Sequence, residues 1–176
     1  MNTFVNIKKL SSIFVVDPYG AKVLISSFWQ SNPAIVVFLR SFACSACRGA
    51  ASDVWAQRDK LGANGTKIIF VGNGSPEAIQ DFKDELKIQS APVYTDPTLE
   101  SFKACGFKMS AMNYYSGDGK INIDKYVAKG FPEKQVKGAF AGDGLQLGGI
   151  VAIRPVDQVT YHYISQVAGD YPEKIT

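Results

Sequence analysis

Short apolar runs recur along the chain, and stretches with helical spacing separate them. Ile35 to Leu39 and Ile68 to Val71 are continuous apolar runs, the pattern of strands that are covered on both faces of a sheet. Pro92 to Thr95 is a shorter run of the same kind. Because strands and helices alternate, we expect an α/β fold with a largely parallel sheet.

Three helices are expected between and after these strands. The first covers Cys44 to Leu61 and places small or apolar residues on one face. The second begins at Ser75-Pro76, an N-cap followed by a proline in the first turn. The third follows Asp96-Pro97 and ends near Cys105, with Gly106 as its C-cap.

A β-hairpin is predicted near each end of the chain. In the first, Phe14 to Val16 and Val23 to Ile25 flank a turn at Asp17 to Gly20. In the second, Ile150 to Arg154 and Val159 to Ile164 form an antiparallel pair at one side of the sheet. The segment before this second hairpin, Asn113 to Ala141, is interpreted as an insertion. We expect it to hold a turn at 117–119 and a short helix at 123–128.

Composition narrows the class of protein. The chain has 176 residues, which suits one domain over 1–176, and a net charge of +3 with no basic run, so a nucleic-acid partner is not expected. No stretch approaches the roughly 18–20 apolar residues that cross a bilayer, so no membrane association is expected. The apolar stretch Ile13 to Val16 is too short for a signal peptide, which makes the cytoplasm the default location.

The chemically most informative feature is Cys44-Ser45-Ala46-Cys47, which follows an apolar strand and opens a helix. Residues at i and i+3 there are close enough for a disulfide, whose Cα atoms lie about 4.4–6.8 Å apart. Unpaired amides and the helix dipole lower a thiol pKa from about 8.5 to roughly 3.5–7.5. Cys44 is therefore the expected attacking thiol and Cys47 the resolving thiol.

Other interpretations of the cysteines stay open at this stage. Buried free cysteines are often small core residues, and this is the simplest reading of Cys105, whose alternative is a third thiol that resolves or relays. Three cysteines with His162, the one histidine, have the composition of a zinc site, but no second paired spacing is present and no metal is expected. His162 lies in the last strand, where a structural role is expected.

Several segments resemble one family in their order along the chain. The segment 38–48 resembles the active-site stretch of the peroxiredoxin-like branch of the alkyl hydroperoxide reductase/thiol-specific antioxidant (AhpC/TSA) family, and 69–77 resembles its second strand–helix junction. Shorter matches are 96–98, 106–108, 144–149 and 169–170. The resemblance implies a thioredoxin-like three-layer sandwich with a central mixed β-sheet.

The resemblance also implies a function. It implies a thiol oxidoreductase with no bound cofactor. We also expect a protein reductant of thioredoxin or glutaredoxin type, and a monomer or homodimer. In the peroxiredoxin pattern Pro-x-x-x-Thr/Ser-x-x-Cys, Ser41 stands at the hydroxyl position and Val37 at the proline position. Ser41 favours peroxide reduction, because its hydroxyl can bond the thiolate, and Val37 counts against it.

Basic and flexible residues complete the candidate site. Arg40, Arg48 and Arg154 are candidates for a positive charge near the thiolate. Gly148 and Gly149 are expected to let the backbone approach the cysteines closely. The prediction is a thiol-dependent redox enzyme that uses the Cys44–Cys47 pair for disulfide exchange or peroxide reduction. The alternative is a non-catalytic redox-sensing or binding module on the same scaffold.

Overall fold

A computed structural model of the chain describes residues 5–110, 117–134 and 139–175. One mixed sheet has the strand order β2-β1-β5-β4-β3-β6-β7. The central strands β3, β4 and β5 are parallel, and the strands on either side of them run antiparallel. The strands are β1 (Phe14–Val16), β2 (Lys22–Leu24), β3 (Ala34–Phe38), β4 (Lys67–Gly72), β5 (Val93–Thr95), β6 (Gly149–Arg154) and β7 (Gln158–Ile164).

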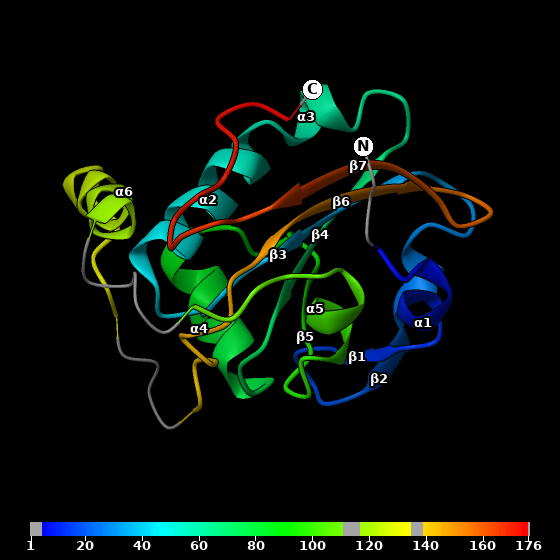
Figure 1. Cartoon of the computed structure of the whole chain (residues 1–176), viewed down its shortest axis with the longest axis horizontal. Coiled ribbons are helices and arrows are strands. Elements are labelled where there is room, and N and C mark those ends of the chain that lie inside the picture. Colours follow the sequence, from blue (N-terminus) through cyan, green and yellow to red (C-terminus); the bar gives the residue numbers. More distant parts are fainter. Residues whose placement is uncertain (1–4, 111–116, 135–138, 176) are drawn as a thin grey trace.

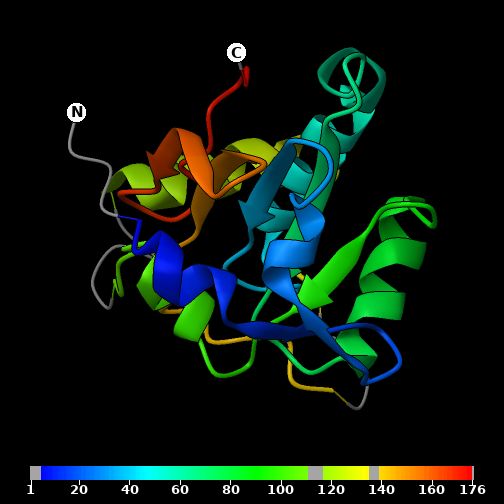
Figure 2. The same cartoon turned by 90° about the vertical axis from the view of Figure 1, so that its right-hand side faces the viewer.

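Helices cover both faces of this sheet, as Figures 1 and 2 show. One face carries α2, α4 and α6, and the other carries α1, η1 and α5. The expected three-layer α/β sandwich with terminal hairpins is therefore confirmed. The helices are α1 (Ile7–Ser11), the 3₁₀ helix η1 (Ile25–Phe28), α2 (Ser45–Ala56), α3 (Arg58–Leu61), α4 (Glu77–Leu86), α5 (Glu100–Ala104) and α6 (Gly117–Ala128).

Strand β3 explains why the sheet is covered on both sides. All five of its residues are buried. Successive side chains of a strand point to opposite faces, so Ile35 and Val37 pack under α2 and α4, whereas Val36 and Phe38 pack against α1 and α5. A continuous apolar run therefore places apolar side chains in the cores on both faces of the sheet.

Two helix predictions need correction at their ends. The expected single helix over 44–61 is two helices, because the backbone at Gln57 leaves helical geometry (φ −91°, ψ 4°) and its N–H bonds to the Val54 carbonyl. The helix α4 begins at Glu77, and Ser75 does not cap it with its side chain. Instead, the Ser75 N–H donates to the Phe140 carbonyl, so this residue ties α4 to a distant loop.

The predicted start of the third helix, directly after Asp96-Pro97, is also too early, since α5 begins at Glu100. Asp96 still serves this end, because its carboxylate accepts the Ser101 N–H at 2.8 Å and the Ser101 hydroxyl at 2.6 Å. The predicted glycine stop is confirmed. Gly106 has φ +71°, and the Phe107 N–H bonds to the Phe102 carbonyl, as in a Schellman motif.

The insertion contains a longer helix than its sequence suggests. The turn expected at 117–119 is wrong, because these residues form the first turn of α6. Packing on α2 provides the stabilisation: a Cβ on Gly49 would lie 2.0 Å from Cδ1 of the Tyr126 ring, so only glycine lets α6 approach this closely. Residues 111–116 and 135–138 of this region lie outside the described residues.

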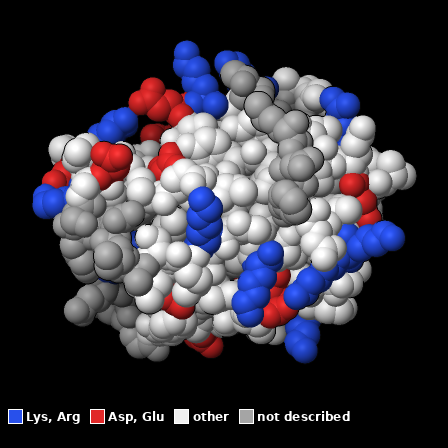
Figure 3. Space-filling model, in the orientation of Figure 1, with Lys and Arg blue, Asp and Glu red and all other residues white. Residues whose placement is uncertain are grey.

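One face of the molecule carries charged side chains of both signs. On the face drawn in Figure 3, basic and acidic side chains are interspersed. Within the described ranges, no helix has the length and apolar character needed to cross a membrane.

Candidate active site

The thiol pair lies where β3 passes into α2. Cys44 is the N-cap residue of α2, with extended backbone (φ −68°, ψ 129°), and its carbonyl accepts the Arg48 N–H at 3.0 Å. Cys47 lies one turn inside the helix. Their side chains are 2% and 1% exposed, and no disulfide joins them in this structure. The carboxyl ends of parallel strands are where α/β folds usually place their sites.

Arg40 is the basic side chain that contacts the first thiol. Its Nη2 lies 2.9 Å from the Cys44 Sγ, and its Nη1 donates to the Gly144 carbonyl at 2.8 Å. The side chain is 3% exposed, so little water separates the guanidinium from the sulfur. A buried positive charge at this distance favours a thiolate.

The surroundings push the pKa values of the two thiols apart. A hydrogen bond from the Cys47 thiol and the Arg40 charge together lower the pKa of Cys44 to about 6, against the opposing effect of burial. Burial raises the pKa of Cys47 well above the ordinary value, and the neighbouring Cys44 raises it further. At neutral pH the site therefore holds a Cys44 thiolate beside a protonated Cys47.

The Ser41 hydroxyl does not contact the thiolate as expected. Its hydroxyl donates to the Ala141 carbonyl at 3.3 Å and accepts the Ala43 N–H at 3.2 Å, so it bonds backbone groups and not the Cys44 sulfur. Its backbone amide instead lowers the pKa of Cys47 slightly. The residue shapes the loop that presents the thiols.

The other two arginines do not reach the sulfur. Arg48 lies in the first turn of α2 and is 4% exposed, but its Nη2 faces the Glu85 carboxylate of α4 at 3.6 Å. Arg154 is exposed at the end of β6. Because β6 runs antiparallel to β3 and Ile153 pairs with Ala34, Arg154 lies at the opposite end of the sheet from Cys44.

The two glycines allow a close approach, but not to the sulfurs. A Cβ on Gly148 would lie 1.9 Å from the Phe38 carbonyl oxygen and 3.0 Å from the Tyr171 hydroxyl. A Cβ on Gly149 would lie 2.2 Å from the Tyr163 carbonyl oxygen. These positions let β6 and the C-terminal segment close over the end of β3.

Two further residues of the site were not singled out from the sequence. Asn73 donates to the Arg40 carbonyl at 2.9 Å and accepts the Asp143 N–H at 2.6 Å, so it joins the thiol loop to the 139–147 segment. Its place after the buried strand β4 is a usable signal. The Tyr171 hydroxyl lies 3.9 Å from the Cys47 Sγ and donates to the Phe38 carbonyl at 3.0 Å. Nothing in the local sequence marks this tyrosine.

With this geometry established, comparison with known proteins places the chain. The family model described as "AhpC/TSA antioxidant enzyme" matches residues 53–167, about two thirds of the sequence. The chain belongs to the AhpC/TSA family. The matched segment begins inside α2, after the thiol pair. Membership makes the protein a thiol oxidoreductase-type enzyme.

Relatives and solved structures agree with this placement. The AhpC/TSA chain is 30% identical to prostamide/prostaglandin F synthase of Aquarana catesbeiana over 95% of its own length and 83% of the relative. It is 27% identical to the thioredoxin-like protein AAED1 of Arabidopsis thaliana, over 93% and 67%. Its fold matches Xanthomonas campestris peroxiredoxin Q with a TM-score of 0.61 and 14% identity, over 88% and 80% of the two chains.

The third cysteine of this AhpC/TSA protein lies on the other face of the sheet. Cys105 packs at 0% exposure among the residues beneath α1 and α5, and burial raises the pKa of its thiol. His162 lies next to it, with its Nε2 2.8 Å from the Cys105 carbonyl oxygen, and burial lowers the pKa of its ring. Among the described residues, no three His, Cys, Asp or Glu side chains form a group that could hold a metal ion.

Proposed function

We propose that the protein is a two-cysteine reductase of small organic peroxides, in which Cys44 attacks and Cys47 resolves. The observation that carries the proposal is the Arg40 guanidinium 2.9 Å from a Cys44 sulfur whose pKa is lowered to about 6. An activated thiolate beside a fixed positive charge suits attack on an O–O bond, in which negative charge develops on the departing oxygen.

In the first step the Cys44 thiolate attacks one peroxide oxygen. An S–O bond forms as the O–O bond breaks, the sulfur is oxidised to sulfenic acid, and the other oxygen leaves as an alkoxide that takes a proton from water. Arg40 neutralises the charge that passes from sulfur to oxygen. Its second bond, to the Gly144 carbonyl, holds the guanidinium in place during this transfer.

In the second step the Cys47 sulfur attacks the Cys44 sulfenic acid. The S–S bond forms, the S–O bond breaks, and the thiol proton leaves with hydroxide as water. Tyr171 is a positioning residue here, since its hydroxyl is anchored on Phe38 and faces the Cys47 sulfur. An external dithiol, of thioredoxin or glutaredoxin type, then supplies two electrons by exchange.

Burial and relatives support the substrate class. Cys44 is 2% exposed, so it is accessible to a small molecule more readily than to a folded disulfide partner. The curated relatives named prostamide/prostaglandin F synthase support an organic substrate. The second candidate is disulfide exchange, which the two-residue spacing of the thiols favours.

The location in the cytoplasm and the oligomeric state, a monomer or a homodimer, stay predictions.

One experiment separates these activities. Fully reduced protein is mixed with cumene hydroperoxide, with hydrogen peroxide and with a model protein disulfide, and intact mass follows the loss of the thiols. We expect fastest formation of a Cys44–Cys47 disulfide with the organic peroxide. Cys47→Ser stops at the sulfenic acid, and Cys105→Ala behaves as the native protein. Faster reaction with the protein disulfide supports exchange, and slow reaction with all three supports a non-catalytic sensor or binding module.

A further inference from the structure

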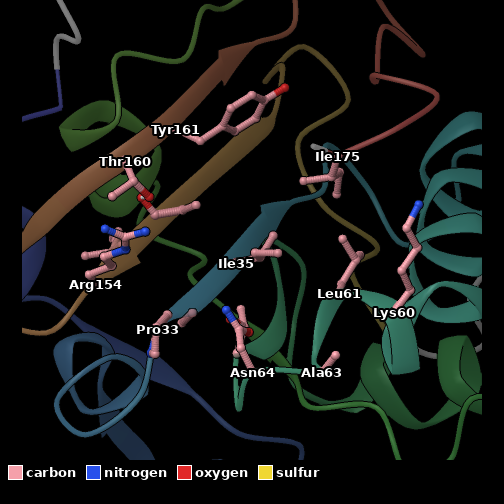
Figure 4. Close-up of a pocket in the computed structure, with 14 residues that line it drawn as sticks. Pro33, Ile35, Lys60, Leu61, Ala63, Asn64, Arg154, Thr160, Tyr161 and Ile175 are labelled. Carbon is pink, nitrogen blue, oxygen red and sulfur yellow. Dashed lines mark hydrogen bonds between the residues drawn. The ribbon is translucent and has the colours of Figure 1, made fainter.

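A groove lies at the end of the sheet opposite the thiols. It encloses about 680 Å³ between the start of β3, the helix α3 and the strands β6 and β7. Figure 4 shows Ile35, Leu61 and Ile175 along its middle, with Arg154 on the β6 side and Lys60 on the α3 side. Pockets for small molecules commonly have about 300–1,000 Å³.

The fold leaves this groove open for two local reasons. The helix layer is thin here, because α2 ends at Ala56 and α3 adds only one turn before the loop at 62–66. The register of β7 also shifts, since Ala152 pairs with Tyr161 while Ile153 pairs with Val159, which leaves Thr160 as an extra residue. A β-bulge of this kind re-aims side chains. Thr160 and Tyr161 both line the groove.

The charges of the groove all have one sign. Lys60 and Arg154 line it, and its lining contains no aspartate or glutamate. In the described part of the chain, neither cation forms an ion pair. Two uncompensated cations above an apolar floor of Ile35, Leu61 and Ile175 are complementary to an anion with an apolar body.

We propose that this groove binds a small carboxylate with an aliphatic or aromatic body. The planar guanidinium of Arg154 pairs with the carboxylate, for which its fork of donors is suited. The apolar body covers Ile35, Leu61 and Ile175, and Lys60 adds attraction from the α3 side. This inference does not depend on the thiol chemistry, because Arg154 and Cys44 lie near opposite ends of β3.

The test titrates the full-length protein with octanoate and follows backbone amide shifts by NMR. We expect saturable shifts around Ile35, Leu61 and Ile175, and weaker binding of 1-octanol. Arg154→Gln lowers the octanoate affinity about tenfold and Lys60→Gln about threefold, because a charge-assisted bond is lost. Arg154→Lys keeps part of the affinity, whereas the control Lys83→Gln, on α4, keeps all of it.

Three outcomes would overturn the proposal. They are shifts that map to the thiol loop, equal affinity for octanoate and 1-octanol, and unchanged affinity in both charge variants. The peroxide assay is run on Arg154→Gln and Lys60→Gln as well, and both are expected to keep the native rate of thiol oxidation. Octanoate titrated into Cys44→Ser should bind as it does to the native chain, so the groove and the thiol chemistry are tested separately.

Discussion

The two faces of the central sheet hold cysteines with similar burial and opposite chemistry. On the α2 face, Cys44 is 2% exposed and its pKa is lowered to about 6. On the face beneath α5, Cys105 is 0% exposed and burial raises the pKa of its thiol. Burial by itself disfavours a thiolate on both faces. The difference comes from what else is buried with the sulfur.

Cys44 has a thiol donor and a guanidinium as neighbours, whereas the pKa of Cys105 is shifted by burial. The chain therefore shows that reactivity is a property of the neighbours and not of the cysteine. Experiments that remove those neighbours one at a time test this comparison.

The largest effect is expected from removing the attacking sulfur. Cys44→Ser should lower the rate of peroxide-dependent thiol oxidation by at least about a thousandfold, as loss of a nucleophile does. Cys105→Ala should leave the rate within about twofold, because its thiol is protonated and lies on the other face. Both rates are measured by intact mass. A native rate in Cys44→Ser, or a large loss in a folded Cys105→Ala, would contradict the comparison.

Removing the charge on Arg40 should move the pH profile. In the native protein the oxidation rate should rise with pH through about 6 and then level, because the thiolate forms above its pKa. In Arg40→Gln the pKa rises, so the inflection shifts upward and the rate at pH 7 falls about tenfold, with recovery at alkaline pH. Arg48→Gln is the matched control, since Arg48 faces Glu85 and should leave the inflection in place.

Asn73 should affect stability more than chemistry. Asn73→Ala removes a buried bond to the Arg40 carbonyl and a half-buried bond from the Asp143 N–H, and should lower the free energy of unfolding by about 1–3 kcal/mol. Asn64→Ala changes an exposed residue and should cost less than about 0.5 kcal/mol. Urea denaturation measures both. An equal decrease in the free energy of unfolding of the two variants would refute the role of Asn73 as a link between the loops.

The smallest effect is expected at Tyr171. Tyr171→Phe should slow the conversion of sulfenic acid to disulfide about threefold, the effect of one weak hydrogen bond, without changing the first oxidation step. Trapping with dimedone measures the sulfenic acid. Tyr163→Phe is the control, because its hydroxyl bonds Asp170 and not the thiols. A change in the first step alone would remove the positioning role.

The sequence located the elements better than their ends. The runs that form β3 and β4 are continuous and apolar, so their burial on both faces was readable. The break at Gln57 and the first turn of α6 could not be predicted from the sequence, because they depend on packing between elements. Tyr126 on Gly49 stabilises a helix that begins Gly117-Asp118-Gly119, a sequence typical of a turn.

The sequence likewise identified some residues of the candidate site and misplaced others. Cys44 and Cys47 were identified because their spacing and the helix start are local facts. Arg40, Arg48 and Arg154 looked equivalent in the sequence, yet Arg40 contacts sulfur, Arg48 faces α4, and Arg154 lies at the far end of the sheet. The hydroxyl of Ser41 was expected on the thiolate and bonds the backbone instead.

By itself the sequence determined what depends on neighbours along the chain: the apolar strands, the presence of helices between them and the paired thiols three residues apart. The tertiary structure alone decided which arginine faces Cys44, that Asn73 joins two loops, that Tyr171 reaches Cys47, and that a cationic groove opens at the other end. These contacts join residues far apart in the chain. Their geometry follows from the order and direction of the strands, which no local pattern of residues specifies.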